Sequence, residues 1–477
     1  MVFEELLKIV SSNKNMNVCS DSRLVKEGDV FVAIKGSVCD GHDFMDSARA
    51  NGAGYIVSQK ICNCKGAKLV LVDDTTQALG MLVQASKDNP ASKLTCFAVT
   101  GTNGKTTVAF LVQSVVQHAG FKCGLIGTIL YDTGLKRLHS PMTTPDSIAI
   151  ADMTSQMVEA GSKYMVLEAS SHALDQNRLA TINFKAAAFT NLTGDHLDYH
   201  KTEECYLEAK TLLFKNLSKE STAVLNQQSP HAKKIAAQTK ANIIWYAVDE
   251  EADLTATIKR MDVGGTEFVM SYKGEQQILK TPLIGLYNIS NLLAAGGLCL
   301  AGGFDLETTA RGLEAMKVIP GRLEKVECDA DFSVVIDFAH TDDALTNVLK
   351  TLKLICKGRL IVVFGCGGNR DRTKRPRMAK AAEKYADFIV VTSDNPRGEQ
   401  AEYIIGEIMT GFDNPVSENI EVEIERADAI KLAIDMAKKD DIVLIAGKGH
   451  ETYQIIGTEK IEFSDQKVAL ECLRNKK

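Results

Sequence analysis

The chain has 477 residues, 45% of them hydrophobic and 24% charged, which is typical of an ordinary globular protein with about three domains. The formal net charge of −6 argues against a nucleic-acid-binding surface, because such a surface needs clustered excess Lys and Arg. No apolar run approaches the roughly 18 residues of a membrane span, so we expect no membrane partner.

The N-terminal sequence MVFEELLKIV has acidic residues where a signal peptide needs basic ones, and this predicts a cytoplasmic protein. Residues 1–90 mix short strands with helices and end at Asp88–Ser92, which we interpret as a linker. The 12 cysteines are scattered, with only Cys62 and Cys64 close together and no C-x-x-C pair. We therefore expect reduced, mostly buried thiols.

Residues 91–317 alternate short apolar runs with longer helical stretches. The runs that we interpret as strands are Cys96–Thr100, Tyr164–Leu167, Ala186–Thr190 and Ala223–Asn226. This alternation predicts a mostly parallel, doubly wound α/β sheet. For residues 254–280 we expect irregular strands and turns.

A Gly-rich loop follows the first of these runs, in LTCFAVTGTNGKTT at residues 94–107. Apolar residues at helical spacing from Val108 onward predict a helix that Gly120 ends. Such a loop surrounds a triphosphate with backbone N–H groups, while Lys105 supplies charge and Thr106 a hydroxyl for Mg²⁺. The general P-loop pattern asks for a small residue where this chain has Val99, so only the shorter form GTNGKT remains. The segment predicts ATP or GTP binding.

Ionisable residues follow the next two predicted strands. Glu168 and His172 lie after one of them, in a pattern that suits a Mg²⁺ site. The segment NLTGDHLDYH, residues 191–200, places two Asp and two His after the other, and this density favours a functional site over a structural one. By its spacing alone, Lys210 would be a solvated helix residue.

After a break near residues 318–322, residues 318–477 show a second series of apolar runs. These are Val334–Asp337, Leu360–Phe364, Phe388–Thr392 and Ile442–Ala446. Polar residues follow each run directly, and ligands of open α/β sheets bind at strand carboxyl ends. We therefore predict a Rossmann-like C-terminal α/β domain that faces the central sheet across a cleft.

Ten ordered motifs resemble those of the Mur ligases and span nearly the whole chain. They are TGTNGKTT, EASSHAL, NLTGDHLDYH, YLEAK, IGLYNISNLLAA, IPGRLE, DFAHTDDAL, GCGGNRDRTKRP, DNPR and AGKGHE. The resemblance implies three domains: a small UDP-binding α/β domain at 1–90, a P-loop ATP-binding domain at 91–317 and an amino-acid-binding domain at 318–477. It also implies a hinge near Pro320 and Gly321, which lets the last domain close over the nucleotide.

The implied reaction is ATP-dependent amide formation through an acyl phosphate. The implied catalytic residues are Lys105, Glu168, His196 and Lys210, of which Lys210 matches the family's carbamylated lysine. The implied Mg²⁺ ligands are Thr106, Glu168, His196 and the Lys210 carbamate. The implied ATP-binding residues are Thr100, Gly101, Thr102, Asn103, Gly104, Lys105, Thr106, Thr107, Asn288, Asn291, Arg322, Asp337 and His340.

The resemblance also implies two organic substrates. Residues matching the family's contacts to UDP-N-acetylmuramoyl-L-alanyl-D-glutamate are Ser22, His42, Thr143, Thr144, Ser170, Gln176, Arg178 and Lys210. Residues matching its amino-acid pocket are Arg370, Asp394, Asn395, Pro396, Arg397, Gly447 and Glu451. In this family the tetrapeptide DNPR marks members that add meso-diaminopimelate in peptidoglycan synthesis. The partners expected are therefore small molecules, and the enzyme is expected to be a monomer.

Two alternatives remain open: a ligase of the same family that adds L-lysine, and a relative that binds nucleotide without ligating. A third, an ATPase, would hydrolyse ATP without either organic substrate. The chain also departs from the family pattern at Phe338, Asp342, Asn369, Gln227 and Gln228. Because none of these touches the phosphate loop, the metal residues or Arg397, we expect them to affect affinity more than reaction type.

Overall fold

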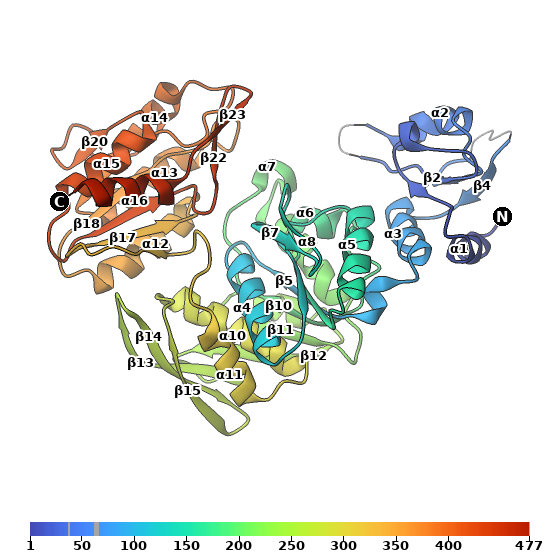
Figure 1. The fold of residues 1–477 in the computed structure, drawn as a ribbon, viewed down its shortest axis with the longest axis horizontal. Helices are drawn as coiled ribbons and strands as arrows, with labels where there is room; N and C mark the ends of the chain where they lie inside the picture. The colour runs from blue at the N-terminus through green and yellow to red at the C-terminus, as the bar shows by residue number, and fades with distance from the viewer. Residues whose placement is uncertain (37–38, 62–65, 477) are drawn as a thin grey trace.

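The computed structural model describes residues 1–36, 39–61 and 66–476, so Cys62 and Cys64 lie outside the described residues. Three lobes follow one another in chain order, with the N-terminal and C-terminal lobes on opposite sides of the middle one (Figure 1). Each lobe is built on its own main sheet, and the predicted α/β fold class is confirmed. Within the described ranges no helix is long and apolar enough to span a bilayer.

The N-terminal lobe has a parallel four-stranded sheet in the order β1-β2-β3-β4. Its strands are Val18–Cys19, Val30–Val32, Tyr55–Ser58 and Lys68–Leu71, and its helices are α1 (Phe3–Ser12), α2 (Met45–Ala50) and α3 (Thr75–Ser86). Asp74 caps α3 by accepting the N–H groups of Thr76 and Gln77. The apolar core between α1, α3 and the sheet continues into Ala151 of the middle lobe, so the two lobes share packing.

The middle lobe holds an eleven-stranded sheet in the order β15-β14-β13-β12-β11-β10-β5-β9-β6-β7-β8. Its strands are β5 (Thr95–Thr100), β6 (Cys123–Ile126), β7 (Leu130–Asp132), β8 (Arg137–His139), β9 (Tyr164–Glu168), β10 (Phe184–Phe189), β11 (Thr222–Asn226), β12 (Asn242–Val248), β13 (Leu254–Asp262), β14 (Gly265–Tyr272) and β15 (Glu275–Thr281). The strands from β13 to β6 are parallel, and antiparallel strands extend both edges. The four predicted strands are confirmed as β5, β9, β10 and β11.

The expectation of irregular structure at 254–280 is wrong. Strands β13, β14 and β15 form a regular antiparallel meander there. Along β14 every second residue is buried while its neighbours stay partly exposed, because the meander packs on one face only. Such a strand alternates apolar and polar residues instead of forming the continuous apolar run of a doubly covered parallel strand.

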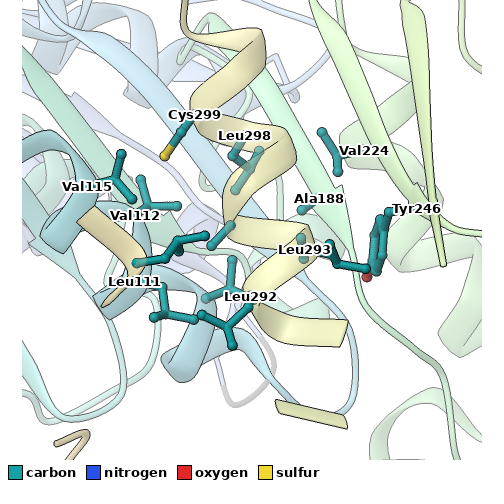
Figure 2. Packing of buried hydrophobic residues seen from close by; sticks show 14 of the residues in the cluster. Leu111, Val112, Val115, Ala188, Val224, Tyr246, Leu292, Leu293, Leu298 and Cys299 are labelled. Carbon is teal, nitrogen blue, oxygen red and sulfur yellow. The ribbon is translucent and has the colours of Figure 1, made fainter. Parts of the chain in front are cut away.

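Helices cover both faces of the middle sheet. They are α4 (Lys105–His118), α5 (Ser147–Glu159), α6 (Ser171–Asp175), α7 (Leu197–His200), α8 (Glu203–Lys215), α9 (Ala232–Ala236), α10 (Leu286–Ala301) and α11 (Leu306–Ala315). Figure 2 shows Leu292, Leu293 and Leu298 of α10 between α4 and the strands. Burying one such leucine contributes about 2 kcal/mol, and this packing holds α10 against the helix that begins at the phosphate loop.

The C-terminal lobe has a six-stranded sheet in the order β16-β17-β21-β18-β19-β20, parallel except for β16. Its strands are β16 (Glu324–Val326), β17 (Ser333–Asp337), β18 (Leu360–Phe364), β19 (Phe388–Val391), β20 (Ile420–Val422) and β21 (Ile442–Ala446), with a separate hairpin of β22 (Tyr453–Ile456) and β23 (Glu459–Glu462). Its helices are α12 (Asp342–Ile355), α13 (Lys374–Tyr385), α14 (Ala401–Met409), α15 (Arg426–Met436) and α16 (Asp465–Asn475). The four strands predicted here are present within one residue of their expected ends.

Candidate active site

The Gly-rich loop predicted to bind phosphate, residues 101–104 and called the phosphate loop below, lies between β5 and α4, as predicted. Lys105 Nζ donates hydrogen bonds to the carbonyls of Gly101 and Thr102, both at 2.8 Å. Gly104 precedes α4 at φ +90°, where a Cβ atom would lie 2.2 Å from Oδ1 of Asn291. This close approach requires glycine and places α10 directly against the loop.

The segment after β10 braces this loop. The Asn191 side chain accepts the N–H of Asn103 at 2.9 Å, and its backbone carbonyl accepts the N–H of Thr102 at 3.0 Å. The Thr190 hydroxyl donates to the carbonyl of Asn103 at 2.6 Å. Part of the motif NLTGDHLDYH therefore shapes the loop, which its density of ionisable residues alone did not indicate.

Lys210 meets the phosphate loop from α8. Its side chain is buried, and Nζ donates to the carbonyl of Gly101 at 3.0 Å, the carbonyl that also accepts from Lys105. The Nζ atom lies 4.2 Å from the ring centroid of Tyr206. Burial, reinforced by the positive charge of Lys105, holds the pKa of Lys210 well below its usual value. The interpretation of Lys210 as a solvated helix residue, which rested on its spacing alone, is therefore wrong.

Glu168 ends β9 beside the loop, fully buried. Its Oε2 accepts the hydroxyls of Thr106 at 3.0 Å and Thr128 at 2.9 Å, and its Oε1 accepts the N–H of Thr128 at 2.9 Å. The Thr128 hydroxyl also lies 3.1 Å from that of Thr143. A carboxylate with hydroxyls around it is the oxygen donor set that Mg²⁺ prefers, so this part of the site fits the ion. Sequence analysis missed Thr128, because no local pattern singles it out.

Two histidines complete this end of the site. The ring centroids of His172 and His196 lie 4.9 Å apart, and Nε2 of His196 is 3.6 Å from Oδ2 of Asp195. Partial burial, opposed by Asp195 but supported by Lys105, lowers the pKa of His196 to about 4. The imidazole is therefore neutral at physiological pH and has a lone pair for a metal or a hydrogen bond. Among the described residues, no three His, Cys, Asp or Glu side chains alone form a metal cluster.

A cleft of about 710 Å³ lies between the N-terminal lobe and the middle lobe. Arg178 lines it, and its guanidinium is fixed by the Gln176 side chain at 2.6 Å and the carbonyl of Thr144 at 2.8 Å. The Thr144 hydroxyl in turn accepts the N–H of Ser170 at 3.0 Å. Four residues predicted to bind the muramoyl dipeptide are therefore joined in one network.

Ser22 and His42 lie within the N-terminal lobe. Asn51 donates to the Ser22 carbonyl at 2.8 Å. His42 is buried, with Nδ1 2.6 Å from Oδ1 of Asp40, while Nε2 accepts the N–H of Gln59 at 3.2 Å. Both ring nitrogens are thus used locally, but Gln59 lines the 710 Å³ cleft, so His42 positions a residue of its wall.

The C-terminal lobe faces the middle lobe across a cleft of about 470 Å³. Its middle-lobe wall includes His172, Asp195 and His196. Its other wall includes five residues of the predicted amino-acid pocket besides Arg370: Asp394, Asn395, Arg397, Gly447 and Glu451. The carboxyl ends of β18, β19 and β21 supply this wall, as predicted from the polar residues that follow those strands.

Arg397 adopts φ +52° and donates from Nη1 to the carbonyl of Gly368 at 2.9 Å. The carbonyl of Pro396 packs over Gly368, where a Cβ atom would lie 1.9 Å from it. Burial and the nearby Arg370 charge lower the pKa of Arg397, although a guanidinium stays protonated. Two cations close together in a cleft favour an anionic group between them.

The segment between α11 and β16 and the end of β17 carry residues that are predicted to bind the nucleotide. Arg322 stacks on Phe338 with Cζ 4.8 Å from the ring centroid, and its Nη2 donates to the Thr106 hydroxyl at 3.4 Å. Asp337 accepts the N–H groups of Leu323 and Ala339 at 2.7 and 2.8 Å. The contact between Arg322 and Thr106 therefore joins the C-terminal lobe to the start of α4, next to the phosphate loop.

The remaining predicted nucleotide residues have structural contacts of their own. Thr100 donates to the carbonyl of Ala169 at 2.8 Å, and Thr107 is buried at the start of α4. Asn288 donates to the carbonyl of Ile284 at 2.9 Å. Nδ1 of His340 lies 2.9 Å from the carbonyl of Phe338, and His340 lines the 470 Å³ cleft.

The departures from the family pattern are accommodated locally. Asn369, at φ +53°, accepts the N–H of Gly398 at 2.9 Å, as a carboxylate could. Oδ2 of Asp342 lies 3.2 Å from Nε of Arg377. Gln227 and Gln228 donate to carbonyls between residues 248 and 251. None of these four interactions involves the phosphate loop.

Comparisons with known proteins assign the family. The model of the Mur ligase middle domain matches residues 99–299, the Mur ligase glutamate ligase domain matches 321–449, and the Mur ligase family catalytic domain matches 16–92. UDP-N-acetylmuramoyl-L-alanyl-D-glutamate--2,6-diaminopimelate ligase of Geobacillus kaustophilus is 41% identical over 96% of this chain and 94% of its own. The protein of that name from Aquifex aeolicus is 44% identical over 95% and 92%.

Solved structures of Mur ligases have the same fold as this chain. A structure of UDP-N-acetylmuramoyl-L-alanyl-D-glutamate--2,6-diaminopimelate ligase superposes with a TM-score of 0.70 and 32% identity, covering 96% of this chain and 94% of the other. MurF ligase from Thermotoga maritima, in complex with ADP, shares the fold, with a TM-score of 0.63 and 21% identity over 97% and 98%. With three matching domain models and relatives above 40% identity along nearly its whole length, this chain belongs to the Mur ligase family.

Proposed function

We propose that this chain is the ATP-dependent ligase that joins meso-2,6-diaminopimelate to UDP-N-acetylmuramoyl-L-alanyl-D-glutamate in peptidoglycan synthesis. The relatives that match it over more than nine-tenths of its length carry this activity in their names. The observation that carries the proposal is the convergence of Lys105 and Lys210 on one carbonyl of the phosphate loop, in a middle lobe that faces Arg397 across the 470 Å³ cleft.

The reaction has two steps. A carboxylate oxygen of the dipeptide attacks the γ-phosphorus of ATP, the bond to the β-phosphate oxygen breaks, and an acyl phosphate and ADP form. The amine of the incoming amino acid then attacks the acyl carbon, a proton is lost, and inorganic phosphate leaves as the amide forms. We assign to Lys105, Arg322 and the loop N–H groups the stabilisation of the charge that develops on the phosphoryl oxygens, and the contacts of Lys105 and Arg322 with the loop support this role.

A magnesium ion fits the oxygen donors of Thr106 and Glu168, with His196 and a carbamylated Lys210 as the further ligands proposed. When bound, it neutralises charge on the transferring phosphoryl group. The lowered pKa of Lys210 supports carbamylation, because the neutral amine is the form that adds CO₂. The carbamate would also replace the repulsion between the buried Lys210 and its neighbour Lys105 by attraction.

Arg397 and Arg370 support the choice of diaminopimelate over lysine. Diaminopimelate carries a second carboxylate on its far carbon, whereas lysine ends in an ammonium group alone. A guanidinium there attracts the first and repels the second. One such charge pair is worth about 2–3 kcal/mol, or a preference of tens to a hundredfold.

We further propose that the enzyme works in the cytoplasm as a monomer on small-molecule substrates only. Its net charge of −6 and the lack of a membrane-spanning helix among the described residues support this setting. The clefts described above lie within one chain, so no second copy is needed to complete them.

The test measures phosphate release and product mass with ATP, Mg²⁺, the UDP-dipeptide, and either meso-diaminopimelate or L-lysine. We expect the diaminopimelate product with at least a tenfold higher kcat/KM, and Arg397→Gln should remove most of that preference. Arg377→Gln is the matched control, because Arg377 lines the same cleft but pairs with Asp342. Equal or faster turnover of lysine would contradict the substrate assignment. ATP hydrolysis without either organic substrate would indicate an ATPase, and no ATP cleavage a non-catalytic relative.

A further inference from the structure

Lys448 is a buried cation in the motif AGKGHE, and neither the sequence analysis nor the proposed reaction gives its side chain a role. It follows β21, and its side chain is fully buried. Its Nζ donates to Oε2 of Glu451 at 3.0 Å and to Oδ1 of Asn395 at 3.2 Å. Asn395 and Glu451 line the 470 Å³ cleft, whereas Lys448 does not. Lys448 therefore stands directly behind two residues of the proposed amino-acid pocket.

The hydrogen bonds fix the orientation of the Asn395 amide. Oδ1 accepts from Lys448 and from the N–H of Ile455 at 2.9 Å, while Nδ2 donates to Oε2 of Glu451 at 2.9 Å. A flipped amide would point its NH₂ group at two donors and its oxygen at a carboxylate. The arrangement with Lys448 in place thus allows one orientation only.

The same network reaches Arg397. The N–H of Arg397 donates to the carbonyl of Ile455 at 3.0 Å, and its carbonyl accepts the N–H of Gly457 at 2.8 Å. Asn395, Arg397 and the first strand of the β22–β23 hairpin are therefore held as one unit. Lys448 is the charged group at the buried end of that unit.

Lys448 also sets the charge of the pocket. The C-terminal wall of the cleft carries four carboxylates and four cations, which are Asp342, Asp371, Asp394 and Glu451, and Arg370, Lys374, Arg377 and Arg397. The ammonium of Lys448 offsets Glu451 from behind, so this wall together with Lys448 carries one net positive charge. Such a pocket favours a substrate with an additional carboxylate over a simple cation. Removing Lys448 would leave the Glu451 carboxylate uncompensated against a buried amide.

We infer that Lys448 is a positioning and specificity residue for the incoming amino acid, which acts through Asn395 and Glu451 without touching the substrate. This inference rests on the proposed function and assigns one determinant of its selectivity.

The test uses Lys448→Met, which keeps the length of the side chain and removes its charge and donors, in the full-length enzyme. We expect KM for meso-diaminopimelate to rise at least tenfold, with KM for ATP and for the UDP-dipeptide changed less than twofold. The kcat/KM ratio of diaminopimelate to lysine should fall at least fivefold. Lys431→Met is the matched control: Lys431 is exposed in the same lobe, in a surface pair with Asp435, and should leave all constants unchanged.

Lys448→Gln, which keeps a donor for Glu451 or Asn395, should recover part of the lost affinity. A uniform rise in all three KM values, or an unchanged selectivity ratio, would overturn the inference and make Lys448 a stability residue. If circular dichroism showed that both variants fail to fold, the inference would be overturned equally. A wild-type enzyme that does not use meso-diaminopimelate would instead refute the proposed function, so the two failures are distinguishable.

Discussion

Lysine residues 105 and 210 place two cations on one backbone carbonyl, with Lys210 buried and Lys105 half-buried. In the part of the chain that the structure describes, neither has a carboxylate within hydrogen-bonding distance, and desolvation lowers the pKa of both side chains. Two like charges this close disfavour each other unless an anion joins them or one lysine loses its proton. In the proposed function, ATP phosphates would supply that anion for Lys105. For Lys210, the neutral amine and its carbamate are the two states that relieve the repulsion.

Lys210→Ala should nearly abolish ligation, by a hundredfold or more in kcat, because it removes the group proposed to hold the metal. The fold should persist, since the substitution also removes a buried charge. Lys215→Ala, at an exposed position in the last turn of the same helix, is the control and should keep full activity. Phosphate release and thermal melting measure the two effects. Full activity of Lys210→Ala would refute the carbamate role.

At the scale of elements, the sequence predicted best what depends on neighbouring residues. Strands β5, β18 and β21 are buried on both faces, so their apolar runs stood out. Glu168 was found because it follows an apolar strand run, whereas the roles of residues 394–397 were implied by the family motif DNPR. Thr128 contacts Glu168 from 40 residues away, and Lys448 contacts Asn395 from 53 residues away. Only folding creates these pairs, so no local pattern could indicate them.

Helix α4 gives an element-scale test, because it has a glycine with positive φ at each end. Gly104 precedes the helix at φ +90°, and a Cβ atom there would meet Asn291. Gly120 follows the helix at φ +85°, and among the described residues no atom beyond its chain neighbours lies within 4 Å of the position a Cβ atom would take. Gly104→Ala should weaken ATP binding at least a hundredfold, because the loop and α10 cannot both keep their places. Gly120→Ala should cost about 1 kcal/mol of stability and leave ATP binding unchanged.

Isothermal titration with ATP and Mg²⁺ measures the binding, and chemical denaturation measures the stability. Equal losses of ATP affinity in the two variants would show that backbone strain alone, and not contact with α10, explains the effect. Unchanged affinity in Gly104→Ala would contradict the assignment of this loop to ATP.

At the scale of the whole molecule, the chain places a different cleft on each side of the middle lobe. The N-terminal lobe faces Arg178 across the cleft of about 710 Å³, and the C-terminal lobe faces His196 across the cleft of about 470 Å³. We therefore propose that the two organic substrates bind in different clefts, one next to the N-terminal lobe and one next to the C-terminal lobe. An enzyme that joins a large nucleotide-linked acid to a small amine needs this separation, since each substrate must approach the acyl phosphate from its own side.

The link between the C-terminal lobe and the phosphate loop gives the whole-molecule prediction. Asn103 of the loop donates to Oδ2 of Asp343 in α12 at 3.0 Å. Asp343→Ala should raise KM for ATP threefold to tenfold, the effect of one hydrogen bond of about 1 kcal/mol, and leave KM for the UDP-dipeptide unchanged. The neighbouring Asp342→Ala is the control, because Asp342 pairs with Arg377 inside its own lobe. Steady-state kinetics with each substrate varied in turn measures both. If the two variants behaved alike, the contact between Asn103 and Asp343 would have no role in holding the nucleotide, and closure would have to depend on other contacts between the lobes, such as that of Arg322 with Thr106.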